Sequence, residues 1–242
     1  MEEFLVIGSS FFTASISAIT GMGGGIALLS VMTFLSYSHR ELVALHGLIQ
    51  LVSNSSRMFF LKESVDKIIL KSFIYGLIPS AILIMFILKE LGDLQKLQLL
   101  IAGIIFYVLF KPKKMKPLKI KKTSFYFLGI YVGLLGPLIG ATGPLLAPFF
   151  LRDDLTKNEI ISTKAAVQML GHFIKIPIFL YAGFNYFSLN LWEVIGFLVL
   201  TILGTRFGVY LLKLLSEKVF RMIYKSVLLL SALRIIYVHL LS

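Results

Sequence analysis

Eight polar side chains at helical spacing are the residues of this 242-residue sequence whose types suit the binding of a small ion. They form two sets, at positions 46, 50, 54 and 57 and at positions 164, 168, 172 and 175. Each set recurs every three or four residues, so its members share one face of a helix. Polar groups inside apolar helices usually face a cavity or a partner. The members are His46, Gln50, Asn54 and Arg57, then Lys164, Gln168, His172 and Lys175.

Each of these residues also has a structural interpretation. Arg57 fits a side chain that snorkels from a helix end, and a membrane glutamine commonly joins two helices. Lys175 is followed by the apolar stretch 176–182, which favours a deep position and a role in lining the cavity. His172, and more weakly His46, is the interior group suited to proton coupling near neutral pH. A hydrogen-bonded structural histidine is the alternative.

Two glycine-rich breaks interrupt the apolar sequence, TGMGGGI at 20–26 and GPLIGATGP at 136–144. A short apolar helix restarts after each break, and its first turn exposes unpaired N–H groups and a partial positive charge. Glycine lets a ligand approach that backbone closely. We therefore expect an anion site where the breaks meet, although tight helix packing is the alternative role for the glycines. The expected backbone contributors are Gly23, Gly24, Gly25, Ile26, Thr142 and Gly143.

The side chains expected around this site are Gln50, Asn54, Gln168, His172 and Lys175, with Arg57 and Arg206 attracting or gating anions from the cytoplasmic side. All 12 Asp and Glu residues lie in loops or near helix ends, so the interior is net cationic. A carboxylate-based sodium site or proton relay is therefore not expected. The chain has no cysteine and no catalytic motif, and we expect neither an enzyme nor a bound cofactor or metal.

The composition is that of an all-α, polytopic membrane protein. Hydrophobic residues make up 57% of the chain and charged residues 15%, and the mean hydropathy is +0.89. Six apolar runs approach the roughly 20 residues needed to cross a bilayer. The net charge of +12 is concentrated in 111–122, where seven lysines indicate a cytoplasmic loop against anionic lipid rather than a nucleic-acid site. The runs are 42–61, 68–88, 94–110, 163–182, 187–212 and 219–241.

An internal repeat relates the two halves at an offset of 118 residues. The glycine-rich breaks correspond, and so do the two polar helix faces. Residues 1–110 are then the first repeat, 111–122 the linker and 123–242 the second repeat. The identical pairs are Gly25 with Gly143, Leu28 with Leu146, Glu41 with Glu159 and Gln50 with Gln168.

The basic residues favour one topology. If segments 4–37 and 123–151 each turn back at their glycines, loops 62–71, 111–122, 152–164 and 213–221 share one side and carry 16 basic residues. The opposite side then has three. If both segments cross instead, the asymmetry disappears, which the positive-inside rule disfavours. Each repeat is therefore expected to be a broken hairpin plus three spans, inverted relative to the other, with both termini outside the plasma membrane.

The sequence resembles the TauE/SafE family of sulfite and organosulfur-anion exporters. The resemblance rests on GMGGGI at 21–26, GATGPLLAP at 140–148, the helix at 163–175 and GTRFG at 204–208. It implies a secondary transporter of a small anion such as sulfite, working by alternating access at a midplane site. A passive anion channel and a non-transporting membrane subunit are the alternatives.

Overall fold

The computed structural model describes residues 2–32, 38–87, 120–139, 142–181 and 183–241, and these ranges are helical with short connections. They contain no strand, in agreement with the predicted all-α class. The predicted span 94–110 and most of the linker lie outside the described residues. The α-helices are α1 (Glu2–Thr20), α2 (Gly24–Met32), α3 (His39–Phe60), α4 (Lys67–Ile87), α6 (Phe125–Ile139), α7 (Gly143–Phe150), α8 (Lys157–Phe173), α9 (Lys175–Tyr181), α10 (Leu191–Leu214) and α11 (Glu217–Leu241), and the 3-10 turns are η1 (Lys62–Ser64), η2 (Lys122–Ser124) and η3 (Tyr186–Ser188).

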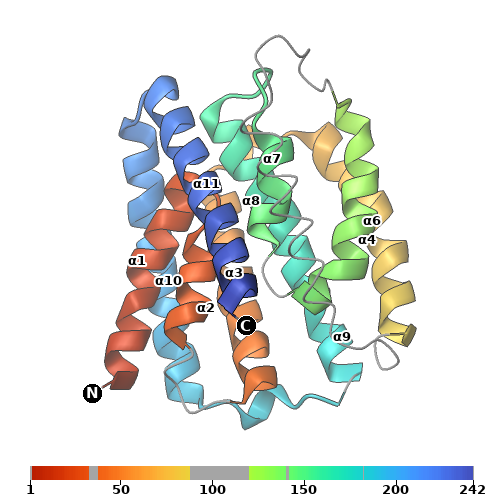
Figure 1. Ribbon diagram of the computed structural model, residues 1–242, viewed down its shortest axis with the longest axis vertical. Coiled ribbons are helices and arrows are strands. Elements are labelled where there is room, and N and C mark those ends of the chain that lie inside the picture. The colour runs from red at the N-terminus through yellow and green to blue at the C-terminus, as the bar shows by residue number, and fades with distance from the viewer. Residues whose placement is uncertain (1, 33–37, 88–119, 140–141, 182, 242) are drawn as a thin grey trace.

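Two broken hairpins enter the helix bundle from opposite ends (Figure 1). Helix α1 rises from the lower end of the view and α2 returns toward it, whereas α6 descends from the upper end and α7 returns upward. The rings of Phe125 and Phe150, at the start of α6 and the end of α7, lie 5.1 Å apart, as expected for a hairpin that closes on itself. The two turns of the hairpins therefore come to lie inside the bundle.

The helix boundaries follow the repeat seen in the sequence. Shifting the first residues of α2 and α3 by 118 gives 142 and 157, and α7 and α8 begin at 143 and 157. Ser38 and Glu41 form a capping box at the start of α3, and Thr156 and Glu159 form one at the equivalent positions of α8. Each box pairs the hydroxyl and the carboxylate with backbone N–H groups that the helix leaves unbonded. The same local signal therefore starts both helices.

The helices of the two halves pack in an exchanged pattern. Helix α1 packs against α10 and α6 packs against α4, while α3 and α8 pack against each other. Glycines permit backbone contact at these crossings: a Cβ on Gly129 would lie 2.1 Å from the Phe73 carbonyl oxygen, and one on Gly204 would lie 2.1 Å from that of Phe11. Small residues at a crossing let membrane helices approach this closely. Each half therefore completes the packing of the other.

The second half departs from the expected pattern in one helix. The sequence predicted a continuous helix over 163–182, but the structure divides it into α8 and α9 at Ile174. Pro177 accounts for the break, because its ring clashes with the carbonyl of the residue four positions earlier and it has no N–H to donate. The equivalent α3 contains no proline and is continuous. The break lies immediately before Lys175.

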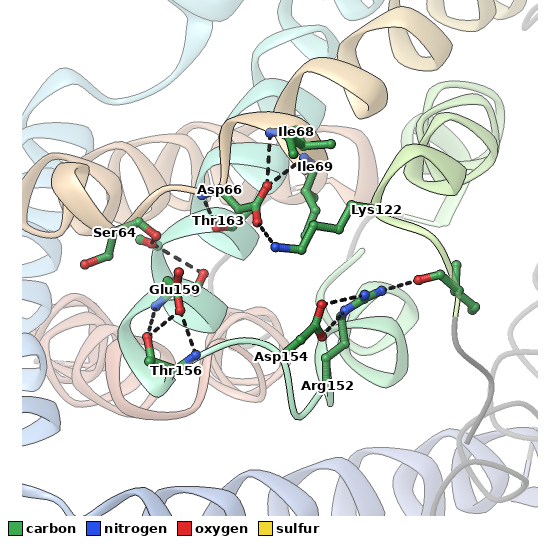
Figure 2. A network of polar contacts seen from close by, with 12 residues as sticks. Ser64, Asp66, Ile68, Ile69, Lys122, Arg152, Asp154, Thr156, Glu159 and Thr163 are labelled. Atoms are coloured by element: carbon green, nitrogen blue, oxygen red, sulfur yellow. Dashed lines mark hydrogen bonds and ion pairs between the residues drawn. The ribbon is translucent and has the colours of Figure 1, made fainter. Parts of the chain in front are cut away.

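Polar contacts join the connections at the upper end of the bundle (Figure 2). Asp66 accepts a bond from Lys122 at 2.6 Å and its backbone N–H donates to Thr163, so α4, α6 and α8 are held together. Burial acts to raise the pKa of Asp66, but hydrogen bonds from Lys122 and from the N–H groups of Ile69 and Ile68 outweigh it and hold that pKa below its usual value. The backbone N–H of Lys157, at the start of α8, donates to the carboxylate of Glu217 in α11. The predicted basic loops, as far as they are described, therefore gather at one end.

The bundle buries a set of polar side chains beside its apolar core and exposes many large apolar side chains. Phe4, Phe12, Phe127 and Trp192 are each at least two-thirds exposed, while Arg57 is only 1% exposed. Among the described residues two helices are long and apolar enough to cross a membrane, Lys67–Phe86 with a mean hydropathy of 2.0 and Leu191–Leu214 with 1.9. A pair of such helices also occurs in soluble cores, but there the exposed surface is not apolar in this way.

The backbone contact between α4 and α6 gives a stability prediction. Gly129→Ala places a methyl group against the Phe73 carbonyl and should lower the thermal midpoint in detergent, since overpacking costs about 1–3 kcal/mol. Gly47→Ala is the matched control, because nothing lies within 4 Å of its Cβ position and alanine favours the helix. Equal midpoints for the two variants would contradict the close packing.

Candidate functional site

A small cavity lies between the two glycine-rich breaks and the polar faces of α3 and α8. Its volume is about 20 Å³, which is room for about one water molecule. Both halves contribute to its wall. The lining residues are Ser17, Gly21, Met22, Gly23, Gly25, Ile26, His46, Gln50, Asn54, Arg57, Thr142, Gly143, Gln168 and His172.

The two broken hairpins direct helix N-termini at this cavity. Gly21 and Gly23 have φ values of +68° and +83°, a left-handed conformation that favours glycine and turns the chain sharply into α2. A Cβ on Gly143, the first residue of α7, would lie 3.8 Å from the Cβ of Met22, so the two breaks meet. The first N–H groups of each short helix have no carbonyl four residues before them inside the helix. The wall therefore presents donors and partial positive charge to the cavity.

The two halves also place identical glycine–glutamine pairs in the wall. A Cβ on Gly25 would lie 2.9 Å from Oε1 of Gln50, and a Cβ on Gly143 would lie 3.2 Å from Nε2 of Gln168. These pairs correspond at the repeat offset of 118. Each glutamine amide rests against the first turn of the short helix in its own half. The amides and the helix N-termini thus form one surface of hydrogen-bonding groups.

Three cations are buried around this surface. Arg57, Lys164 and Lys175 have exposures of 1%, 0% and 2%. Arg57 Nη2 donates to Ser53 at 3.2 Å, but its Nε has no hydrogen-bond partner among the described residues. Lys164 Nζ lies 5.4 Å from the centre of the Tyr224 ring and has no hydrogen-bond partner there either. Because a Cβ on Gly21 would lie 3.7 Å from that Nζ, the ammonium group lies beside the first break.

None of the carboxylates that the structure describes is buried beside these cations. The ion pairs among the described residues, such as Lys122 with Asp66, lie at the upper end and not around the cavity. Removing an ion from water costs several kcal/mol unless a partner compensates it. The unpaired donors and uncompensated positive charge of Arg57 and Lys164 are suited to an anion.

Most of the residues predicted for the site come together in this wall. Those that line the cavity are Gly23, Gly25, Ile26, Gln50, Asn54, Arg57, Thr142, Gly143, Gln168 and His172. Lys175 is buried at the start of α9 beyond the lining, and its charge acts on both cavity histidines. Arg206 is exposed on α10. Gly24 instead contacts α1. A Cβ at Gly24 would lie 1.8 Å from the Thr13 carbonyl oxygen, so the lack of a side chain lets α2 pack against α1.

Lys164 was absent from the predicted site and was counted with the basic loop 152–164. The structure corrects that count, because Lys164 is fully buried in α8. Its membership of the polar face was the signal in the sequence, since it occupies the position equivalent to His46. Ser17, Gly21, Met22 and His46 also line the cavity without having been assigned to it. Gly21 and Met22 belong to the first break, whereas Ser17 carried no signal.

Comparison with known proteins gives one family. The family model described as "Sulfite exporter TauE/SafE" matches residues 6–235, nearly the whole chain. The resemblance seen in the sequence motifs is thereby confirmed. No curated protein and no solved structure gives a match.

The uncompensated charge of Lys164 predicts opposite effects on stability and binding. Lys164→Met keeps the length of the side chain and removes the buried charge, so the anion-free variant should be at least as thermally stable as the wild type. Its affinity for the substrate anion should fall about 10- to 150-fold, since a charge-assisted hydrogen bond is worth about 1.5–3 kcal/mol.

Lys218→Met is the matched control, because Lys218 is exposed at the start of α11. Thermal midpoints and anion titrations on the same preparations provide the measurement. A less stable Lys164→Met variant with unchanged affinity would show that Lys164 supports the fold rather than the site.

Proposed function

Because the chain belongs to the sulfite exporter TauE/SafE family, we propose that it is a secondary transporter that carries sulfite or a related sulfur oxyanion across the cell membrane. Family membership makes it a membrane transport protein and assigns it to a transporter family rather than an enzyme family. The substrate, the site and the mechanism are the parts that we propose. They rest on the cavity between the two hairpins.

The observation that carries the proposal is the buried positive charge around that cavity. Arg57 and Lys164 are at most 1% exposed, and each has a donor without a hydrogen-bond partner among the described residues. A bound anion supplies the missing counter-charge and accepts from those donors. An oxyanion has several acceptor oxygens, which suits a wall of amide and backbone N–H donors as well as cations. The substrate is thus the partner that the buried cations lack.

The size of the cavity favours a compact inorganic anion. A volume of about 20 Å³ does not admit an extended organic sulfonate without rearrangement of the wall. Sulfite has four heavy atoms, so the wall must also move to admit it, but by less than an extended organic sulfonate requires. Sulfite or an ion of similar size is therefore preferred over larger members of the organosulfur class.

We further propose that the two halves are inverted repeats across a membrane crossed several times. The opposite entry of the two hairpins and the exchanged packing of α1 on α10 and α6 on α4 support this arrangement. The upper end, which carries the described basic loops, then faces the cytoplasm together with the linker 111–122, and the termini face outward. A midplane site between broken helices is a recurring transporter design that permits alternating access.

Reconstitution in proteoliposomes tests the proposed activity. Vesicles that contain the wild-type protein should take up sulfite, and Arg57→Met should reduce that flux because it removes a buried cation from the lining of the cavity. An imposed ion gradient should drive sulfite above its equilibrium level. Purely dissipative flux would identify a channel, and the absence of flux for sulfite, thiosulfate and sulfate would favour a non-transporting subunit.

The proposed topology predicts one-sided chemical labelling. The chain has no cysteine, so single cysteines can be introduced at Glu63, at the upper end, and at Phe187, in the loop at the lower end. Both positions are exposed. A membrane-impermeant thiol reagent added to intact cells should label the Phe187→Cys variant and not Glu63→Cys, which should react only after permeabilisation. Labelling of both from outside would exclude the inverted arrangement.

A further inference from the structure

His46 and His172 form a pair of imidazoles across the two halves of the cavity. They belong to α3 and α8, and their ring centroids lie 6.4 Å apart with an edge-to-face angle of 78°. Both line the cavity and are at most 2% exposed. The repeat does not require this pair, because the residue equivalent to His46 is Lys164 and the residue equivalent to His172 is Asn54. The two rings meet only through the packing of α3 against α8.

The contact to Gly25 assigns the hydrogen on the His46 ring. Nε2 of His46 lies 2.8 Å from the carbonyl oxygen of Gly25. A carbonyl oxygen can only accept, so Nε2 carries the hydrogen and Nδ1 of the neutral ring has a free lone pair. Nδ1 of His46 and Nδ1 of His172 are both buried and have no hydrogen-bond partner among the described residues. The buried lone pair on Nδ1 of His46 can therefore take a proton, and the neutral His172 ring also has one acceptor nitrogen.

Among the described residues, the charge that acts on both rings is cationic. The charge of Lys175, at the start of α9, acts on both rings. On α1, α2 and α7 the lining residues carry no titratable side chain. On α11, the Tyr224 hydroxyl is occupied by the Ala147 carbonyl. The neighbouring helices also carry Arg57 on α3, Lys164 on α8, Tyr131 on α6 and the exposed Arg206 on α10. The carboxylates of α3, α8 and α10 stand in the first turn of each helix, at Glu41, Glu159 and Glu193.

We infer that His46 and His172 form a proton-binding site that fills together with the substrate anion, so that the anion crosses the membrane with one proton. The inference rests on the proposed anion transport. With no carboxylate among the described residues buried at the cavity, the anion itself must stabilise an imidazolium there. A second proton is opposed by the first at a centroid distance of 6.4 Å and by Lys175.

Coupling of this kind is reciprocal. If a bound anion increases the affinity of the pair for a proton, a bound proton increases the affinity for the anion by the same factor. The affinity for the anion therefore rises as the pH falls, and binding withdraws a proton from solution. Both effects are lost when the pair can no longer take a proton, although the cationic wall that holds the anion remains.

Proton uptake on binding is the direct test. Sulfite is titrated into the purified protein by calorimetry in two buffers with different ionisation enthalpies, between about pH 5 and pH 8. The wild type should take up about one proton more per sulfite than the double variant His46→Gln/His172→Asn. His172→Asn copies the residue at the equivalent position of α3, and the glutamine side chain of His46→Gln retains a donor for the Gly25 carbonyl. The protonation of sulfite itself is common to both proteins and cancels.

Asn54→Ala is the matched control, since it alters the wall without removing a titratable group. It should weaken sulfite binding and leave the number of protons unchanged. In proteoliposomes a pH gradient with the acidic side outside should drive sulfite accumulation by the wild type but not by the double variant. Equal proton numbers and equal pH dependence of affinity in wild type and double variant would overturn the inference while leaving anion binding intact. Absence of sulfite binding by the wild type would instead overturn the proposed function, and the coupling with it.

Discussion

Positive charge buried without a carboxylate beside it is the constraint on which the rest of this structure depends. Arg57 and Lys164 each lose several kcal/mol of hydration on burial, and the described carboxylates lie outside the core. Apolar packing elsewhere in the bundle offsets that cost in total, but it supplies no counter-charge at the site. The helix N-termini beside the cavity add further positive potential rather than relieve it. The bundle is thus stable as a scaffold while its centre is electrostatically incomplete, which is the condition under which a small anion gains most from entering.

The broken hairpins solve the second problem of such a site, which is access to backbone donors inside a membrane. An unbroken helix bonds its own N–H groups, and irregular backbone at membrane depth is tolerated only against protein or a wet cavity. The positive φ values of Gly21 and Gly23 reverse the chain within three residues, so that α2 starts at the cavity. Gly24 then packs that short helix against α1. The same run of glycines therefore serves both the site and the packing that holds it.

Sequence reasoning reached the all-helical fold, the family and most of the wall because those features have local signals. The capping boxes at Ser38 and Thr156 and the glycine runs mark the same boundaries in both halves. The direction in which individual side chains point could be predicted less well from the sequence. The sequence places Lys164 near a helix start, but only the packing of α8 buries it against Tyr224. Arg206 points outward because the packing of α10 against α1 decides which face of α10 is buried. The sequence of α10 alone does not show that packing.

The residues that are identical in the two halves and the residues that differ have different places in the site. Gly25 with Gly143 and Gln50 with Gln168 are identical pairs, and they form the parts of the wall nearest the two helix N-termini. The other polar positions differ between the halves. At the offset of 118, His46 corresponds to Lys164, Asn54 to His172 and Arg57 to Lys175. A scaffold with equal halves would hold an anion without preference for either side of the membrane. In the proposed inverted arrangement, the unequal titratable groups give the two sides of the site different electrostatics.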